Sequence, residues 1–219
     1  PPFFFQPHDG IPDPLWSRGL GDVYKRQYIL SIILTLATFL SAQEPELPGW
    51  GLYVGAGLGS ATFEDDMGAD IGFEPALPFI GVNKGVMLGL PLVVNVGFGK
   101  RSYNMEMDLL GETVTSSASL DYLDIAAFMP YPLGPGFAQV GALYGTPLGG
   151  KATMDLGGSE ESDDIESDDM DPDFGLVLAY AYPINEQISV NAGYYLGLAE
   201  QSDGGPKFNG LCVLLGYTF

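Results

Sequence analysis

The hydrophobic and polar positions of this chain alternate with a period of two over long stretches. In residues 187–199, large apolar residues take one set of alternate positions, and mostly small or polar residues take the other. Such alternation indicates strands whose two faces meet different surroundings. Eight segments share it: 50–60, 73–82, 91–103, 119–131, 137–149, 174–182, 187–199 and 208–219. No stretch of a dozen residues shows the 3.6-residue period of an amphipathic helix, so the sequence predicts an all-β protein.

The connections between these segments alternate in length. Short turns are expected at 82–85, 130–136 and 183–187. Long polar loops are expected at 61–72, 104–118, 152–171 and 200–207. Short and long connections in alternation are typical of an up-and-down barrel with one smooth end and one loop-rich end. We therefore predict a single eight-stranded antiparallel up-and-down β-barrel with its first and last strands paired.

The two faces of the strands differ in side-chain size. One face carries leucine, valine, isoleucine and aromatic residues, and the other is mainly glycine, alanine, serine and asparagine, with almost no lysine or glutamate. Small side chains suit the narrow interior of eight strands, and an apolar outer face suits lipid. This predicts a transmembrane barrel with aromatic anchors at Tyr131, Tyr144, Tyr182, Tyr194, Tyr217 and Phe219. A soluble lipocalin-like barrel, with its apolar face inward, is the alternative.

The N-terminal 42 residues do not join this pattern. Residues 1–27 are rich in proline, and their part SRGLGDVYKRQ resembles translated sequencing-adapter read-through; a genuine disordered tail is the alternative. Residues 28–42 form an uncharged apolar run ending in Ser41 and Ala42. Fifteen residues are too few to span a bilayer as a helix, which needs about 20. The run fits the h-region of a secretory signal, with a buried first helix as the alternative, and the barrel domain is expected over 43–219.

Several of these segments together resemble a known family. They are GWGLYVGAGLGS (49–60), LDYLDIAAFMPYPLG (120–134), DFGLVLAYAYPI (173–184) and the terminal GYTF (216–219). With the signal segment, they are similar to the eight-stranded outer-membrane β-barrels of the OmpA/PorT type found in Gram-negative bacteria. The resemblance covers residues 43–219 and implies location in the cell outer membrane. It implies no shared catalytic residues, and we expect no peptidoglycan-binding domain after Phe219.

Composition excludes several classes of function. The chain has 8 lysines and arginines against 28 aspartates and glutamates, a formal charge of −20, so it lacks the basic surface that nucleic-acid binding requires. Its one cysteine allows neither an intrachain disulfide nor a cysteine-cluster zinc site. Yet 46% of the residues are apolar and only 16% are charged, which is unlike a disordered acidic chain.

The charge gathers in one acidic segment, 154–173. Its weak metal-ligand candidates are Asp163, Asp164, Glu166, Asp168 and Asp169. Hard cations such as Ca²⁺ need several oxygen ligands, but the spacing does not match the twelve-residue calcium loop. We interpret the segment first as a solvated, mobile loop that folding does not require. Weak Ca²⁺ or Mg²⁺ binding, or bridging through divalent cations to lipopolysaccharide, is the alternative.

Catalytic chemistry has little support in the sequence. The single histidine, His8, lies in the excluded leader, so Ser102, Ser116, Ser117 and Ser119 lack the usual base. Cys212 falls on the predicted lumen face, where a small buried apolar role is favoured. We predict no catalytic site and no cofactor.

One charged pair is predicted inside the barrel. Arg101 shares a face with Asn95 on one strand, and Asp124 shares a face with Tyr122 on the next. An unpaired charge in so narrow a lumen is costly, so we expect Arg101 and Asp124 to form an ion pair. The alternative places Arg101 above the membrane rim, in water.

Two classes of function follow from these observations. The first is a monomeric outer-membrane barrel with a structural or interaction role, no open pore and no nucleic-acid partner. The second is a barrel that binds a small molecule or lipid, either a soluble lipocalin-like protein or a narrow channel.

Overall fold

The structure is a computed structural model that describes residues 47–219 except 64–68, 110–111, 157 and 202–204. The expected leader (1–27) and signal segment (28–42) lie outside the described residues. Within them, one 3₁₀ helix, η1 (Ser167–Asp169), accompanies ten strands. No helix in this part of the chain has the length and apolarity to cross a membrane. The strands are β1 (Trp50–Thr62), β2 (Asp70–Gly72), β3 (Glu74–Met87), β4 (Pro91–Leu109), β5 (Glu112–Leu133), β6 (Gly136–Leu156), β7 (Ser159–Ile165), β8 (Asp173–Pro183), β9 (Ile188–Gly197) and β10 (Lys207–Thr218).

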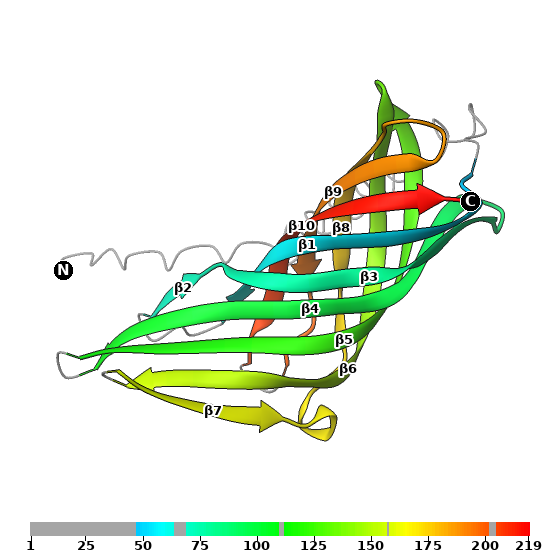
Figure 1. The fold of residues 1–219 in the computed structure, drawn as a ribbon. Helices are drawn as coiled ribbons and strands as arrows, with labels where there is room; N and C mark the ends of the chain where they lie inside the picture. Colours follow the sequence, from blue (N-terminus) through cyan, green and yellow to red (C-terminus); the bar gives the residue numbers. More distant parts are fainter. Residues whose placement is uncertain (1–46, 64–68, 110–111, 157, 202–204) are drawn as a thin grey trace, which may run out of the picture. The chain divides into compact units, whose positions relative to one another are not determined.

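Eight of the ten strands close into a ring, which confirms the predicted barrel. The pairing order is β4-β3-β1-β10-β9-β8-β6-β5, and β5 returns to β4. Every pair is antiparallel, and the first strand lies beside the last, from Gly51 opposite Thr218 to Thr62 opposite Lys207. Figure 1 shows the ring seen from the side. Only β2 and β7 lie outside it, and each pairs with one ring strand: β2 with β4, and β7 with β6.

The short connections all lie at one end of the ring, called the turn end here. Two of the predicted turns are confirmed: one at Gly134, between β5 and β6, and one at 184–187, between β8 and β9. The turn predicted at 82–85 is wrong, because β3 continues to Met87 and the chain reverses at Leu88–Leu90, where Gly89 has a φ of 75°.

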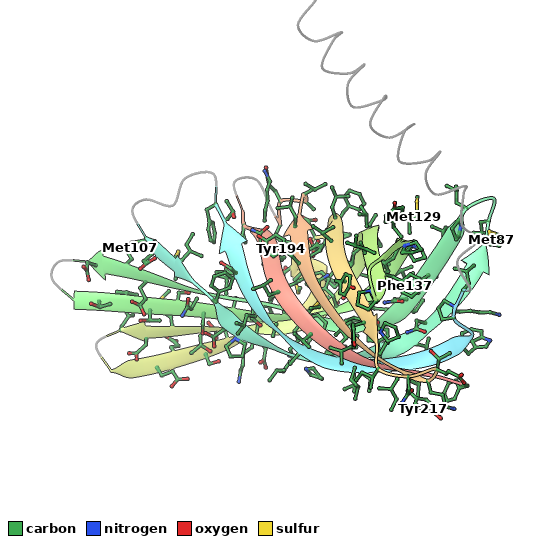
Figure 2. All side chains as sticks on the ribbon, turned by 90° about the horizontal axis from the view of Figure 1, so that it is seen from above. Met87, Met107, Met129, Phe137, Tyr194 and Tyr217 are labelled. Carbon is green, nitrogen blue, oxygen red and sulfur yellow. The ribbon has the colours of Figure 1, made fainter. Side chains whose placement is uncertain are left out.

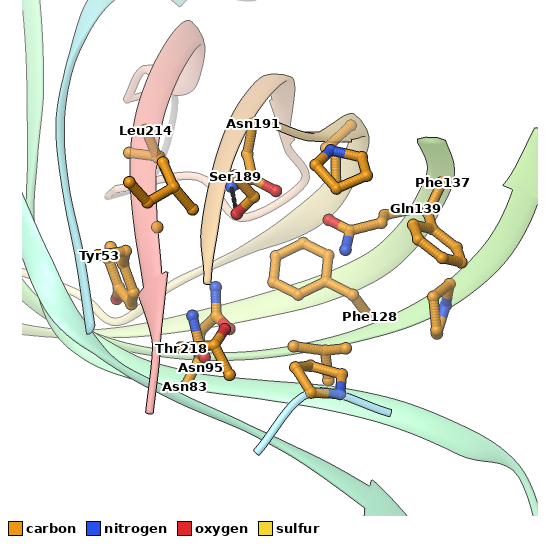
Figure 3. A pocket seen from close by; sticks show the side chains of 18 of the residues that line it. Tyr53, Asn83, Asn95, Phe128, Phe137, Gln139, Ser189, Asn191, Leu214 and Thr218 are labelled. Atoms are coloured by element: carbon orange, nitrogen blue, oxygen red, sulfur yellow. Dashed lines mark hydrogen bonds between the residues drawn. The ribbon is translucent and has the colours of Figure 1, made fainter. Parts of the chain in front are cut away.

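The residues at 82–85 have another use in the barrel. Asn83 points into the lumen (Figure 3). The amide of Gly85 donates a hydrogen bond to the carbonyl of Pro48 at 2.9 Å, and a Cβ at Gly85 would lie 2.6 Å from that carbonyl oxygen. Asparagine and glycine favour turns in general, but here Asn83 lines the lumen and Gly85 admits the close approach of the backbone at Pro48.

At the opposite end, three ring strands run on beyond the others. We call the resulting sheet the projecting sheet; it consists of β2, β7 and residues 102–109, 112–120 and 149–156 of β4, β5 and β6 (Figure 1). The long loops predicted at 104–118 and 152–171 are therefore wrong in large part. Both faces of these strands are polar or weakly apolar. They therefore lack the strong difference in hydrophobicity between alternate residues by which a membrane strand is recognised.

Outside the ring, the side chains form an apolar belt. Leu178 is 63% exposed, Val213 is 56% exposed and Val140 is 53% exposed, each on the outer face. Near the turn end the belt carries exposed aromatic residues, among them Tyr131, Tyr182, Tyr217 and Phe219. Figure 2 shows Tyr217 at the turn end and Met107 at the far end of the projecting sheet. The predicted outer face is confirmed, and it has the composition of a lipid-facing surface.

The belt ends where the outer face of β4 and β5 becomes polar. Lys100 stands opposite Asp121 across these strands and forms an ion pair with it. Beyond this pair the outward positions are occupied by polar or acidic residues such as Glu106, Thr115 and Asp155. The Lys100–Asp121 pair therefore marks the boundary between the lipid-facing belt and the water-facing projecting sheet.

Removing the tip of the projecting sheet should leave the ring folded. The carboxylates of β7 are exposed, and this strand pairs with β6 alone. Deletion of residues 158–164 is therefore expected to preserve the difference in gel mobility between the unheated and the boiled protein. A deletion of equal length in ring strand β9, residues 190–196, should abolish it. Loss of the mobility difference in the first variant would show that the hairpin is part of the folding unit.

Candidate functional site

A buried charged cluster crosses the lumen at the level of the outer belt. Arg101 enters from β4 and is 5% exposed, and Asp124 enters from β5 and is 7% exposed. The guanidinium holds this carboxylate in a fork, with Nη2 at 2.8 Å from Oδ1 and Nη1 at 3.1 Å from Oδ2. The structure thus brings together the two residues of the predicted interior pair. It does not place Arg101 in water above the rim.

A second carboxylate, which the sequence analysis did not single out, completes the cluster. Asp173, the first residue of β8, is 0% exposed, and its Oδ2 accepts a hydrogen bond from Arg101 Nε at 2.7 Å. Asp124 and Asp173 stand opposite the same residue of β6, Gly145, on its two neighbouring strands. The register therefore fixes both carboxylates at one height in the barrel.

Gly145 provides the space in which this cluster forms. A Cβ at this position would lie 2.8 Å from Asp124 Oδ1, 3.0 Å from the Tyr122 ring and 3.2 Å from Arg101 Nη2. A Cβ on Gly99 would also meet the Asp124 carboxylate. Both glycines are thus needed for close approach of the charged groups.

Aromatic residues enclose the arginine. The rings of Tyr122 and Tyr195 each have their centroid 5.0 Å from Arg101 Cζ, a distance at which cation–π attraction acts. Tyr122 is 0% exposed and donates a hydrogen bond to Gln201 Oε1 at 2.8 Å. Phe208 is 1% exposed and lies edge-on to Tyr122, at 6.4 Å between ring centroids. Charged and aromatic groups together fill the lumen at this height.

The cluster stabilises the closed barrel, because its buried hydrogen bonds join β4, β5 and β8. Burying three charges is expensive, but the fork of two hydrogen bonds from Arg101 to Asp124 and the single hydrogen bond to Asp173 recover much of that cost. Loss of one partner leaves the others buried and unpaired.

Substituting Gly145 tests the fit of the cluster without removing a charge. Gly145→Ala is expected to lower the free energy of unfolding by about 1–3 kcal/mol, because the added methyl group overpacks the Arg101–Asp124 contact. Urea unfolding in lipid vesicles measures it. Gly134→Ala, at a turn with φ of 61° and open space around the site, is the control for a purely backbone effect. If Gly145→Ala lowered the free energy of unfolding no more than Gly134→Ala does, the packing argument would be contradicted.

The predicted metal candidates do not converge. Asp163 and Asp164 project from opposite faces of β7, and Glu166, Asp168 and Asp169 follow at η1. Among the described residues, no three histidine, cysteine or carboxylate side chains are grouped so that they could hold a metal ion. The segment 154–173 is exposed for most of its length, as expected, but it contains the end of β6, strand β7 and η1 rather than one loop.

Asp173 could have been found from the sequence by counting positions. It lies two residues before Gly175 and four before Val177, so it belongs to the lumen-facing set of its strand. The run of acidic residues just before it hid this relation, because Asp173 resembled the last member of a solvated segment. The sequence signal for such a residue is an acidic side chain at the end of a strand, in the alternate set of positions that faces the lumen.

The closed ring and its lipid-facing belt agree with what a comparison of sequences finds. A family model described as outer membrane protein beta-barrel domain matches residues 32–219. The chain belongs to this family, and its location is the cell outer membrane. In such barrels the short turns face the periplasm and the longer connections face outward, so the turn end is periplasmic and the projecting sheet is extracellular.

Solved structures of outer membrane proteins are similar to this chain at low sequence identity. Neisserial surface protein A is 14% identical with a TM-score of 0.46, and the match covers 80% of this chain and 100% of that one. Ail of Yersinia pestis, solved with the heparin analogue sucrose octasulfate, is 11% identical with a TM-score of 0.38, covering 78% and 99%. OprG of Pseudomonas aeruginosa is 11% identical with a TM-score of 0.36, covering 79% and 97%. No curated protein matches the chain. The family assignment therefore rests on the family model.

Proposed function

We propose that this protein is a closed outer-membrane barrel with a structural or interaction role, without a conducting pore and without catalytic activity. The observation that carries the proposal is the cluster of Arg101, Asp124 and Asp173, whose members are at most 7% exposed. A water-filled pore would leave the charged side chains in its lumen accessible to water. Here they are bonded to one another, and Tyr122 and Phe208 seal the space beside them.

Absence of catalysis is supported by the residues available. The described part of the chain contains no histidine, and its one cysteine, Cys212, faces the lumen. The carboxylates of the cluster are held in fixed, buried hydrogen bonds to Arg101, which makes them poorly placed to exchange a proton with a substrate.

The conductance of the purified barrel tests the closed state. Wild-type protein in a planar bilayer is expected to give no stable single-channel current. A variant that removes all three charges and their bulk, Arg101→Ala with Asp124→Ala and Asp173→Ala, should show discrete currents if it folds. Regular currents from the wild type would refute the closed barrel, whatever the variant does.

The interaction role is supported by a row of five outward side chains on the extracellular side, four of which are carboxylates. Asp70, Glu106, Thr115, Asp155 and Glu160 stand opposite one another in succession across the outer face of the projecting sheet. Like charges directly opposite on neighbouring strands destabilise a sheet. A divalent cation would relieve the repulsion between Asp155 and Glu160, and phosphate groups of lipopolysaccharide would supply its remaining oxygen ligands.

Added Mg²⁺ should therefore stabilise the protein beyond the effect of ionic strength. We expect the thermal midpoint to rise more in Mg²⁺ than in NaCl of equal ionic strength. The double variant Asp155→Asn with Glu160→Gln should lose this difference. The control Asp168→Asn with Asp169→Asn removes the same charge from η1, away from the row, and should keep it. An equal response in all three proteins would contradict the bridging role.

A further inference from the structure

The periplasmic half of the lumen holds a cavity of about 410 Å³, which lies within the size range of small-molecule sites. Figure 3 shows side chains from several strands pointing into it, among them Tyr53, Asn95, Phe128, Gln139 and Asn191. Its mouth is bordered by the exposed turn residues Asn185, Glu186 and Gln187. The cavity therefore opens at the turn end, toward the periplasm.

The other end of this cavity is blind. A smaller cavity of about 90 Å³ shares Tyr53, Asn95 and Cys212 with it and is also lined by Arg101 and Asp124. Beyond these, the lumen is filled by the buried charged cluster and its aromatic neighbours. A molecule that enters from the periplasm meets a floor, so the cavity is a pocket rather than a passage.

The wall of the larger cavity is almost free of charge. Among the described residues that line it, the polar groups are mainly carboxamides and hydroxyls, and one carboxylate, Glu186, lies at the exposed mouth. In a chain with a formal charge of −20, this is a marked local exception. An ion that entered would lose hydration without meeting a counter-charge. The wall chemistry thus selects uncharged molecules.

Two features of the wall define what such a molecule must offer. The carboxamides of Asn95, Gln139 and Asn191 line the cavity, and their oxygens are acceptors for a hydroxyl or amide donor. The rings of Phe128 and Phe137 line the same cavity and call for an apolar or aromatic face. From these groups we infer that the pocket binds a small uncharged molecule with a hydroxyl or amide donor and an apolar face, taken up from the periplasm.

The single cysteine of the chain gives a direct assay of this pocket. Cys212 lines it, so labelling of its thiol by the uncharged reagent N-ethylmaleimide reports access. The folded protein in proteoliposomes is expected to react, and the anionic reagent sulfonatoethyl methanethiosulfonate should react about tenfold more slowly, after each rate is divided by its rate with glutathione. Equal normalised rates for the two reagents, or no labelling by N-ethylmaleimide, would overturn the uncharged pocket.

Protection of Cys212 then tests binding. N-acetyl-tyrosinamide, N-acetylglucosamine and benzyl alcohol are uncharged probes with donors, and N-acetyl-tyrosine is an anion matched to the first. At least one uncharged probe should slow labelling with saturation, and N-acetyl-tyrosine should not. Asn95→Leu should raise the half-protecting concentration about five- to tenfold, as expected for a lost hydrogen bond. Asn104→Leu, on the outer face of the projecting sheet, should leave it unchanged.

The outcomes decide the proposal even if Asn95→Leu fails to fold, because the comparison of the charged and uncharged probes uses the wild type. Absence of protection by all three uncharged probes overturns it, as does equal protection by N-acetyl-tyrosine. An unchanged half-protecting concentration in folded Asn95→Leu removes Asn95 from the site.

Discussion

Arg101→Met is expected to destabilise the folded barrel by about 3–5 kcal/mol, the largest effect of any single substitution considered. The change removes the guanidinium that binds both Asp124 and Asp173, and it leaves two like-charged carboxylates in the lumen. Asp173 is 0% exposed, so water cannot take the place of the lost hydrogen bonds without opening the structure. Reversible urea unfolding in lipid vesicles, followed by gel mobility, measures the loss.

A triple variant separates the role of the charges from the role of packing. Arg101→Met combined with Asp124→Leu and Asp173→Leu removes every charge of the cluster and keeps most of its volume. Its stability should return to within about 1–2 kcal/mol of the wild type, because replacing a complete buried ionic group is far less costly than breaking it. A triple variant as unstable as Arg101→Met would show that the cost arises from packing around the arginine.

Val213→Arg is expected to lower stability by about 2–4 kcal/mol, or to prevent insertion. Val213 is 56% exposed on the outer face of β10, midway between Tyr217 near the turn end and Asn209. It therefore lies near the middle of the lipid-facing belt, where a guanidinium loses its hydration. Folding yield in vesicles and the midpoint of urea unfolding both report the effect.

The matched control carries the same charge on the water-facing sheet. Ser117 lies on the outer face of β5, beyond the Lys100–Asp121 boundary, so Ser117→Arg should cost less than about 1 kcal/mol. Similar losses at Val213 and Ser117 would contradict the position of the boundary. A neutral Val213→Arg would contradict the lipid-facing assignment of β10 itself.

The ring strands could be predicted because lipid and lumen impose opposite demands on alternate residues. On β10 the apolar set Leu211, Val213 and Leu215 faces outward, and small residues such as Gly210 and Cys212 face inward. A slip of one residue would exchange these faces, so the register is strongly specified. The prolines of β3, Pro75 and Pro78, lie before Ile80, where the ladder to β4 begins, so on that edge they have no partner, although the other edge of the strand pairs with β1. Strand edges without a ladder partner tolerate proline.

The projecting sheet could not be predicted in the same way. In residues 112–120, threonine and serine alternate with valine, serine and alanine, and both faces are only moderately apolar. A strand whose outer face meets water needs no apolar face toward lipid, so its two faces differ little and its sequence predicts a loop. Threonine and valine do favour strands, and that propensity was the signal available.

Only two of the three charged residues of the buried cluster could be predicted from the sequence, and the reason is the order of the strands in the ring. Arg101 and Asp124 could be paired because they lie on neighbouring strands of the sequence order. Asp173 belongs to β8, and it meets the pair only because β6 places Gly145 between β5 and β8. Knowledge of the ring order is therefore needed to assign the third member.

The most direct test of the transmembrane barrel is a scan of spin labels along β10 in lipid vesicles. Labels on Cys212, and on Leu214→Cys in a Cys212→Ser background, should be shielded from oxygen dissolved in the lipid. Labels at 211, 213 and 215, introduced as cysteines in a Cys212→Ser background, should be accessible to it. In a transmembrane barrel of this register, oxygen accessibility should alternate with a period of two and have its maxima at the odd positions. Accessibility that is uniform along the strand, or that peaks at 212 and 214, would contradict it.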